Sequence, residues 1–126
     1  MSEVTVKKVA EIEAYKGEHA IPGMHFRPVG KNLGVTAWGM SVIEIDAGCT
    51  KYPEHDHVEN GQEEVYYVLR GSGTLQAEGK ETPVSEGTIV RVPPNQKRKF
   101  LPGPKGIALI AIGGTPGKAY PTPQKK

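Results

Sequence analysis

Two histidines and an acid that follows them, His55, His57 and Glu64, are the residues best suited to chemistry in this chain. Residues two apart in an extended strand point to the same side, so both imidazoles can converge on one point. Glu64 follows a loop whose Asn60-Gly61 dipeptide indicates a turn. Two His and one carboxylate on one side of a metal form the facial triad that leaves positions open for substrate or oxygen. Taken alone, the His-x-His triplet also fits surface polarity in an acidic loop.

The segments around these residues are typical of short strands separated by turns. Sixteen glycines and 11 prolines in 126 residues are too many for a helical bundle. No stretch shows helical periodicity with a cap at each end. Evenly spaced short strands favour an all-β closed barrel or two-sheet sandwich, and a closed sheet hides its edges. The expected strands are residues 38–45, 63–70, 74–78, 81–84, 88–92, 97–101 and 106–112, with a hairpin at 79–80.

The length of the chain fits one domain with an irregular beginning. An edge strand is expected at residues 4–9, where lysines discourage unwanted pairing. A short extended piece is expected around His25-Phe26, within a stretch rich in glycine. The expected units are residues 1–34 as an N-terminal strand and irregular arm that packs on the barrel or extends it, 35–113 as the barrel, and 114–126 as a C-terminal tail.

Charge, cysteine content and hydropathy exclude several classes of protein. The formal net charge is +2, and the basic stripe with interleaved aromatic residues that is typical of nucleic-acid binders is missing. No apolar run approaches the length that crosses a bilayer, and the first residues lack the apolar core of a signal peptide. Cys49 is the only cysteine, so no intramolecular disulfide and no cysteine-based zinc site can form. We expect a cytoplasmic protein that binds neither nucleic acid nor membranes.

The histidine pair lies in a pattern that resembles the first motif of the cupin superfamily: Gly, a short spacer, His-x-His, a few residues, Glu, a second spacer and Gly. In this chain six residues separate Gly48 from His55, and six separate Glu64 from Gly71. The departures are one extra residue before the first histidine and a longer loop before the acid. The spacing to Gly71 favours Glu64 over Glu63, because neighbours in a strand face opposite sides.

A later stretch resembles the second cupin motif, in which Gly is followed by Pro-x-Gly, a His and an Asn. Gly87 and Pro93 match with the right spacing. Asn95 stands where glycine is usual, a mild change because asparagine also tolerates a left-handed conformation. Arg98 stands where the family has its third metal-binding histidine, and Pro102 replaces the asparagine. The second motif is therefore only partly present.

The resemblance covers residues 38–112 and implies a single-domain jelly-roll barrel of the small, stand-alone type-2 kind. It also implies that His55, His57 and Glu64 hold a divalent metal, with Fe, Mn, Ni and Zn all open. Small cupins resemble homodimers in which edge strands extend the sheet across a two-fold axis, and we expect a homodimer here. Fold transfers well between relatives, whereas function transfers poorly.

Arg98 has four possible roles. A guanidinium stays charged and has no lone pair for a metal, so an inward Arg98 would repel the cation. It could instead fork onto Glu64 and withdraw that carboxylate from metal binding. It could also hold the carboxylate or phosphate of an anionic ligand. Finally, it could turn to solvent like its neighbours Lys97 and Lys99.

Three functions follow from these alternatives. The first is a metal-dependent oxygenase, isomerase or lyase acting on a small anionic organic substrate that Arg98 or Arg91 orients. The second is a metal-free cupin that binds its ligand with Arg98 in place of the metal-binding histidine. The third is a scaffold with a packed interior. It ranks last because paired inward histidines are costly to bury without a partner.

Several other residues are weaker candidates. Tyr66 has the same strand parity as the triad acid, so it lines the pocket or fills the core. Arg91 lies in the middle of a strand and either faces the pocket or pairs with an acid on the outside. Trp38 is expected in the core or at an interface rather than beside a ligand. His19 and His25 lie in the N-terminal arm, where they could cover the mouth of the barrel or remain on the surface.

Overall fold

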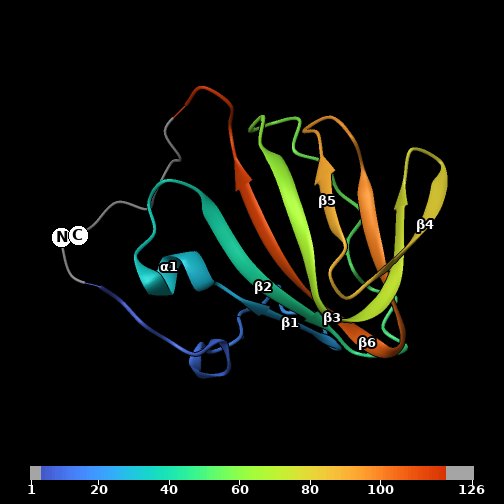
Figure 1. The fold of residues 1–126 in the computed structure, drawn as a ribbon, viewed down its shortest axis with the longest axis horizontal. Coiled ribbons are helices and arrows are strands. Elements are labelled where there is room, and N and C mark those ends of the chain that lie inside the picture. Colours follow the sequence, from blue (N-terminus) through green and yellow to red (C-terminus); the bar gives the residue numbers. More distant parts are fainter. Residues whose placement is uncertain (1–3, 119–126) are drawn as a thin grey trace.

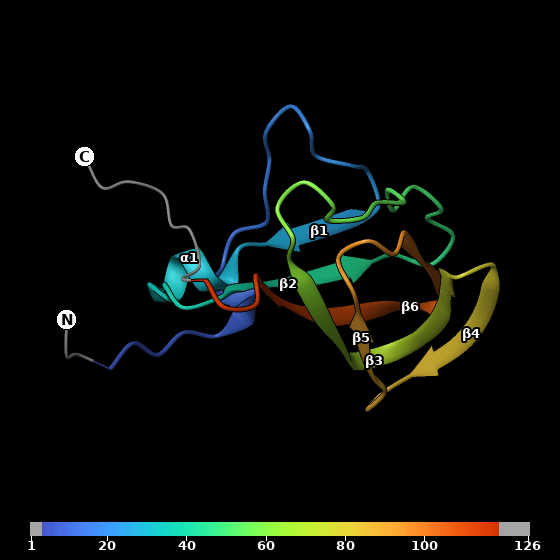
Figure 2. The same cartoon turned by 90° about the horizontal axis from the view of Figure 1, so that it is seen from above.

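Residues 4–118 are described by a computed structural model, in which one antiparallel sheet makes up most of the molecule (Figure 1). The strand order is β1-β2-β6-β3-β4, with β5 paired to β3. Figure 2 shows this sheet curling round from β1 and β2 to β4. The all-β prediction is confirmed. The elements are η1 (Val9–Glu11), β1 (Met24–Arg27), α1 (Val29–Leu33), β2 (Gly39–Ile45), β3 (Glu63–Ala77), β4 (Lys80–Ser85), β5 (Ile89–Val92) and β6 (Arg98–Gly114).

The two long strands, β3 and β6, form a bent ribbon that shapes the barrel. They stay paired through two register shifts, one of them between Gly71 and Gly73. Gly71 has φ 78°, and a Cβ there would lie 2.2 Å from the carbonyl oxygen of Gly106. Glycine therefore permits a bulge at which the ribbon bends without ending. This corrects the sequence prediction, which ended a strand at residue 70 and split β6 into two strands.

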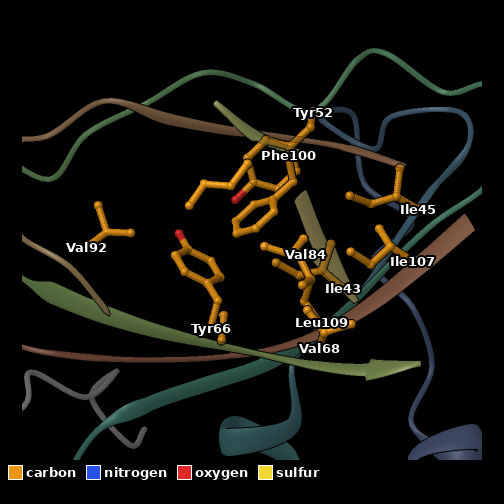
Figure 3. Packing of buried hydrophobic residues seen from close by; sticks show 12 residues of the cluster. Ile43, Ile45, Tyr52, Tyr66, Val68, Val84, Val92, Phe100, Ile107 and Leu109 are labelled. Carbon is orange, nitrogen blue, oxygen red and sulfur yellow. The ribbon is translucent and has the colours of Figure 1, made fainter. Parts of the chain in front are cut away.

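The inside of the curled sheet is filled by one hydrophobic cluster (Figure 3). Phe100 and Leu109 of β6 are fully buried, and Tyr66 of β3 is almost so. Figure 3 places the hydroxyl oxygens of Tyr52 and Tyr66 on one side of the cluster, opposite Ile45 and Ile107. The core therefore has an aliphatic end and an end with polar atoms. Its buried members are Ile43, Ile45, Tyr52, Tyr66, Val68, Leu75, Val84, Val92, Phe100, Ile107, Leu109 and Ala111.

A second, smaller cluster joins the N-terminal arm to the outer face of the sheet. Ile12 and Val29 pack there against Val42 of β2. The edge strand expected at residues 4–9 is not formed, since residues 4–8 carry no regular structure and β1 already occupies the edge beside β2. The extended piece expected around His25-Phe26 is β1 itself. Helix α1, too short to show a periodic pattern, was not expected. No helix among the described residues is long and apolar enough to span a bilayer.

Candidate metal centre

The two histidines lie on the loop between β2 and β3, and backbone hydrogen bonds tie this loop to the start of β6. The His55 amide donates to the Arg98 carbonyl at 3.2 Å, and the Arg98 amide donates back at 2.9 Å. The His57 amide donates to the carbonyl of Pro94 at 2.8 Å. The loop is therefore held in an extended form beside the sheet, although it belongs to no regular strand. Glu64 is the second residue of β3.

The structure brings His55, His57 and Glu64 together inside the curled sheet. Glu64 Oε1 lies 3.2 Å from His57 Nε2 and 3.9 Å from His55 Nε2. One ligand atom from each residue lies within 4.8 Å of the other two, so the group is close enough to hold a metal ion. The two imidazoles meet nearly edge to face, with ring centres 5.1 Å apart. The acid is Glu64 rather than Glu63, as the spacing predicted.

The hydrogen bonds of the outer ring nitrogens decide the tautomer of each histidine. His55 Nδ1 lies 3.0 Å from the carbonyl oxygen of Pro53, which can only accept, so this nitrogen carries the proton. His57 Nδ1 lies 3.2 Å from Asn60 Oδ1, an atom identified as oxygen because it also accepts from the Gln62 amide. Both Nδ1–H groups are therefore donors, and in each neutral ring Nε2 carries the lone pair.

This arrangement fits a cation. His57 Nε2 is buried and has no hydrogen-bond partner among the described residues, although Glu64 Oε1 lies 3.2 Å away. Two lone pairs from the imidazoles of His55 and His57 thus face a carboxylate oxygen, which is unfavourable unless positive charge lies between them. Ring nitrogens held from behind by a carbonyl or amide oxygen are typical of histidines that bind a metal.

Glu64 is ionised in this environment, because its positive neighbours outweigh its burial. Burial by itself raises the pKa of Glu64. The imidazoles of His55 and His57 when they carry a second proton, the hydrogen bond from Tyr66 and the charge of Arg98 together leave that pKa below its usual range. The nearby Glu64 carboxylate, 3.9 Å from His55 Nε2, raises the pKa of His55 in turn. A proton on His55 therefore competes with a metal for the same nitrogen.

Arg98 is fully buried, and its guanidinium contacts other residues of the chain. Its Nη1 lies 3.4 Å from Glu64 Oε1, and its Nη2 donates to the carbonyl of Pro93 at 3.0 Å. The guanidinium does not line the cavity, so it holds the carboxylate from behind. The alternative in which Arg98 turns to solvent is therefore wrong. The guanidinium lies inward and contacts Glu64 Oε1, and its repulsion of a bound cation stays a prediction.

Tyr66 and Arg91 lie on opposite faces of the sheet. Tyr66 is buried and donates its hydroxyl hydrogen to Glu64 Oε1. Arg91 pairs with Val65 in the β3–β5 register, which places it outside, where its side chain is exposed and forms an ion pair with Glu63 at 3.0 Å. The prediction that Arg91 faces the pocket is wrong, and its alternative, pairing with an acid on the outside, is confirmed.

Tyr52 and Trp38 belong to the site but were not singled out for it from the sequence. Tyr52 is buried, with its ring centre 5.9 Å from that of His55. Burial raises the pKa of Tyr52 to about 12, so its hydroxyl stays protonated. Trp38 is 45% exposed and lines the cavity, which corrects the expectation of a core or interface residue. Only the position of Tyr52, three residues before the first histidine, could have indicated its role.

The triad lies in the wall of a cavity of about 1100 Å³. His25 contacts Asp46, and His19 is exposed beside Glu18. Neither of these two histidines lines the cavity. Lys31 is the only lysine or arginine among the described residues that line it. The wall is mostly apolar away from the triad. The lining side chains include Met24, Phe26, Val35, Trp38, Ile43, Tyr52 and Pro53, together with Thr36, Ser41, Gln62 and Tyr66.

The family model of the cupin domain matches residues 41–112, more than half of the chain, and the chain therefore belongs to the cupin family. A cupin protein from Bacteroides fragilis is 21% identical, covers 98% of this chain and 93% of its own, and has a TM-score of 0.73. A sugar phosphate isomerase of the cupin superfamily from Silicibacter pomeroyi is 18% identical, with 86% and 74% covered and a TM-score of 0.75. These likenesses show the fold alone, an all-β cupin jelly roll.

A predicted oxalate decarboxylase from Thermotoga maritima has the same fold, with 19% identity, coverage of 86% of this chain and 97% of that chain, and a TM-score of 0.68. A comparison with curated proteins finds no match.

Proposed function

We propose that this cupin binds a divalent metal through His55, His57 and Glu64 and uses it to hold a small organic ligand in the cavity. One observation carries the proposal: the buried lone pair of His57 Nε2 faces Glu64 Oε1 at 3.2 Å with no hydrogen bond to satisfy it. Two imidazoles and one carboxylate suit Fe, Mn, Ni or Zn. When bound, such a metal supplies Lewis-acid chemistry at an oxygen of the ligand.

The protein's own residues prepare this site. The backbone carbonyl of Pro53 and the side-chain oxygen Oδ1 of Asn60 accept hydrogen bonds from the two rings and hold their Nε2 atoms turned inward. Tyr66 and Arg98 both hold Oε1 of Glu64, whereas its Oε2 accepts no hydrogen bond from any described residue. Oε1 is thus held in place beside the two Nε2 atoms, and Oε2 is free to bind the metal as well.

A metal-dependent isomerase or lyase acting on a small anionic compound is the reaction class we favour. The names of two structural relatives, a sugar phosphate isomerase and a predicted oxalate decarboxylase, support these two classes. An oxygenase, the third class expected from the sequence, would use the same triad. Lys31 is the basic residue placed to attract an anion, since Arg98 is held by Glu64 and Arg91 lies outside the cavity.

The test is metal content and metal titration of the purified protein. We expect about one Mn²⁺, Fe²⁺, Ni²⁺ or Zn²⁺ per chain after reconstitution, measured by elemental analysis and calorimetry. The variant His55→Ala/His57→Ala should lose this uptake. A matched control, His19→Ala/His25→Ala, also removes two histidines but should keep it. Wild-type protein that takes up none of these metals would overturn the proposal.

The second candidate is metal-free ligand binding, and the Arg98 guanidinium 3.4 Å from Glu64 Oε1 is the observation that favours it. In that case the arginine supplies the positive charge at the carboxylate. Thermal stabilisation by organic acids would then persist in chelator and disappear in Arg98→Ala. Arg98→His separates the two candidates further, because a large gain in metal uptake would show that the native arginine suppresses metal binding.

A further inference from the structure

The walls of the cavity differ in chemistry from the triad. Phe26 of β1 is opposite Ile43 of β2 in the register, and both line the cavity. Met24, two residues before Phe26 and on the same face of β1, and Trp38, just before β2, also line it. Phe26 and Trp38 are 43% and 45% exposed, so large aromatic rings are left partly in water beside the site. Apolar surface gathered around a cavity is typical of a ligand site.

A phosphorylated sugar does not match such a wall. Its hydroxyl groups and dianionic phosphate lose hydrogen bonds to water on entry, and each loss is costly unless the protein supplies a partner. On the β1–β2 side the lining side chains are Met24, Phe26, Trp38, Met40 and Ile43, with only the hydroxyls of Thr36 and Ser41 among them. A two-carbon dianion would leave most of a cavity of about 1100 Å³ unfilled.

We infer that the ligand has one oxygen-donor head group and an apolar body of aromatic size. This inference rests on the proposed function, since the head group, a carboxylate or a neighbouring hydroxyl and carbonyl, is held at His55, His57 and Glu64. The body lies against Phe26 and Trp38. Burying the body removes both its own apolar surface and these exposed rings from water, and ring contacts add to that gain.

The test compares ligands that share a head group and differ only in the body. Acetohydroxamate, octanohydroxamate and 2-naphthohydroxamate carry the same metal-binding head, and calorimetry measures their affinities for Ni²⁺-loaded protein. We expect 2-naphthohydroxamate to bind about 100-fold more tightly than acetohydroxamate. Octanohydroxamate distinguishes an aliphatic body from an aromatic one, and it should bind between the two. Equal affinities for all three compounds would overturn the inference.

Two variants locate the body. Phe26→Ala should reduce the preference for 2-naphthohydroxamate over acetohydroxamate by about 3- to 10-fold. Tyr15→Ala removes a ring of similar exposure, 45%, that does not line this cavity, and should leave the preference unchanged. An equal loss of preference in both variants, or in neither, would contradict placement of the body at Phe26.

Failure of this inference is distinguishable from failure of the proposed function. Elemental analysis of the same samples reports metal uptake independently of the ligands. If metal binds and the body makes no difference, the metal site stands and the inference falls. If no metal binds, the proposed function falls, and 2-naphthoate and acetate are compared in chelator. A preference for 2-naphthoate then supports the apolar cavity, whereas equal binding overturns it.

Discussion

Two carboxylates of the sheet, Glu44 and Glu64, have similar side-chain exposure, 19% and 15%, and both lie among cationic groups. Glu44 accepts from Arg27 through Oε1 at 3.0 Å and from Arg70 through Oε2 at 2.8 Å. Both oxygens are therefore satisfied, each by one arginine. The contacts of Glu64 all gather on Oε1. The first acid completes a structural ion-pair network on β2, and the second retains free capacity beside two unprotonated nitrogens.

This difference shows that burial and nearby charge alone do not identify a functional carboxylate. The pKa of each acid lies below its usual range, because positive neighbours outweigh burial in both cases. What separates them is the distribution of partners over the two oxygens, together with the orphaned Nε2 of His57. Removing one or the other acid should therefore have different consequences.

The largest effect should come from Glu64→Gln. A neutral amide replaces the only anionic ligand, and we expect metal affinity to fall by at least about 100-fold. Glu44→Gln is the matched control and should bind metal as the wild type does. Calorimetric titration with Ni²⁺ or Mn²⁺ checks both variants. Undiminished binding in Glu64→Gln, or equal losses in both, would contradict the assignment of Glu64 as the ligand.

A glycine beside Glu64 should be the next most sensitive position. Gly113 faces Glu64 in the β3–β6 register, and a Cβ there would lie 3.2 Å from Glu64 Cγ and 3.4 Å from its Oε2. Gly113→Ala should displace the carboxylate and lower metal affinity by about 10-fold. Gly114→Ala serves as control, since its Cβ would meet nothing within 4 Å. The same metal titration measures both, and an unchanged affinity in Gly113→Ala would show that the carboxylate needs no such space.

The outer face of the sheet differs between its two halves, and this difference bears on assembly. Near β2 it is covered by the arm, whereas Ile89 of β5 and Ile112 of β6 are 67% and 36% exposed. The homodimer expected from the sequence stays a prediction. If this face forms it, Ile89→Lys should weaken dimerisation by about tenfold, as measured by light scattering over a dilution series. Val58→Lys changes an equally exposed loop valine, 62%, and should leave the mass unchanged.

The smallest expected effect concerns pH and the stability contributed by Glu44. Burial raises the pKa of Glu44, but hydrogen bonds and charge from Arg27 and Arg70 outweigh it and leave the pKa low. A carboxyl group whose pKa is lower in the folded state than in the unfolded state stabilises the fold. The stabilisation is complete above the unfolded-state pKa of about 4.3, and it is lost as the pH falls through the folded-state pKa. The gap in urea midpoint between wild type and Glu44→Gln should therefore be largest at neutral pH.

That gap should close once the pH falls below the lowered pKa of folded Glu44, since both side chains are then neutral in the folded and the unfolded state. Glu59→Gln, an exposed acid of the histidine loop, is the control and should show no gap at any pH. A gap for Glu44→Gln that persists unchanged down to pH 2.5 would show that packing, rather than charge, accounts for its contribution.

Local sequence patterns were sufficient for most of the architecture. The strands were predicted from β-branched and aromatic residues. The hairpin expected at residues 79–80 is present one residue earlier, with Glu78 and Gly79 in the β3–β4 turn and Ala77 opposite Lys80. The His-x-His spacing and the six residues between Glu64 and Gly71 singled out the triad that the structure brings together. These features depend on neighbours in the chain, which is why short-range rules detect them.

The roles of Arg98, Arg91, Tyr52 and Trp38 were decided only by tertiary structure. Arg98 lies 34 residues from the carboxylate it holds, so no spacing rule connects the two. The face on which Arg91 lies depends on the register between β3 and β5, in which a shift of one residue would reverse it. Which side chains share a cavity, and which oxygen each donor reaches, depends on how the sheet curls, because long-range packing sets that geometry.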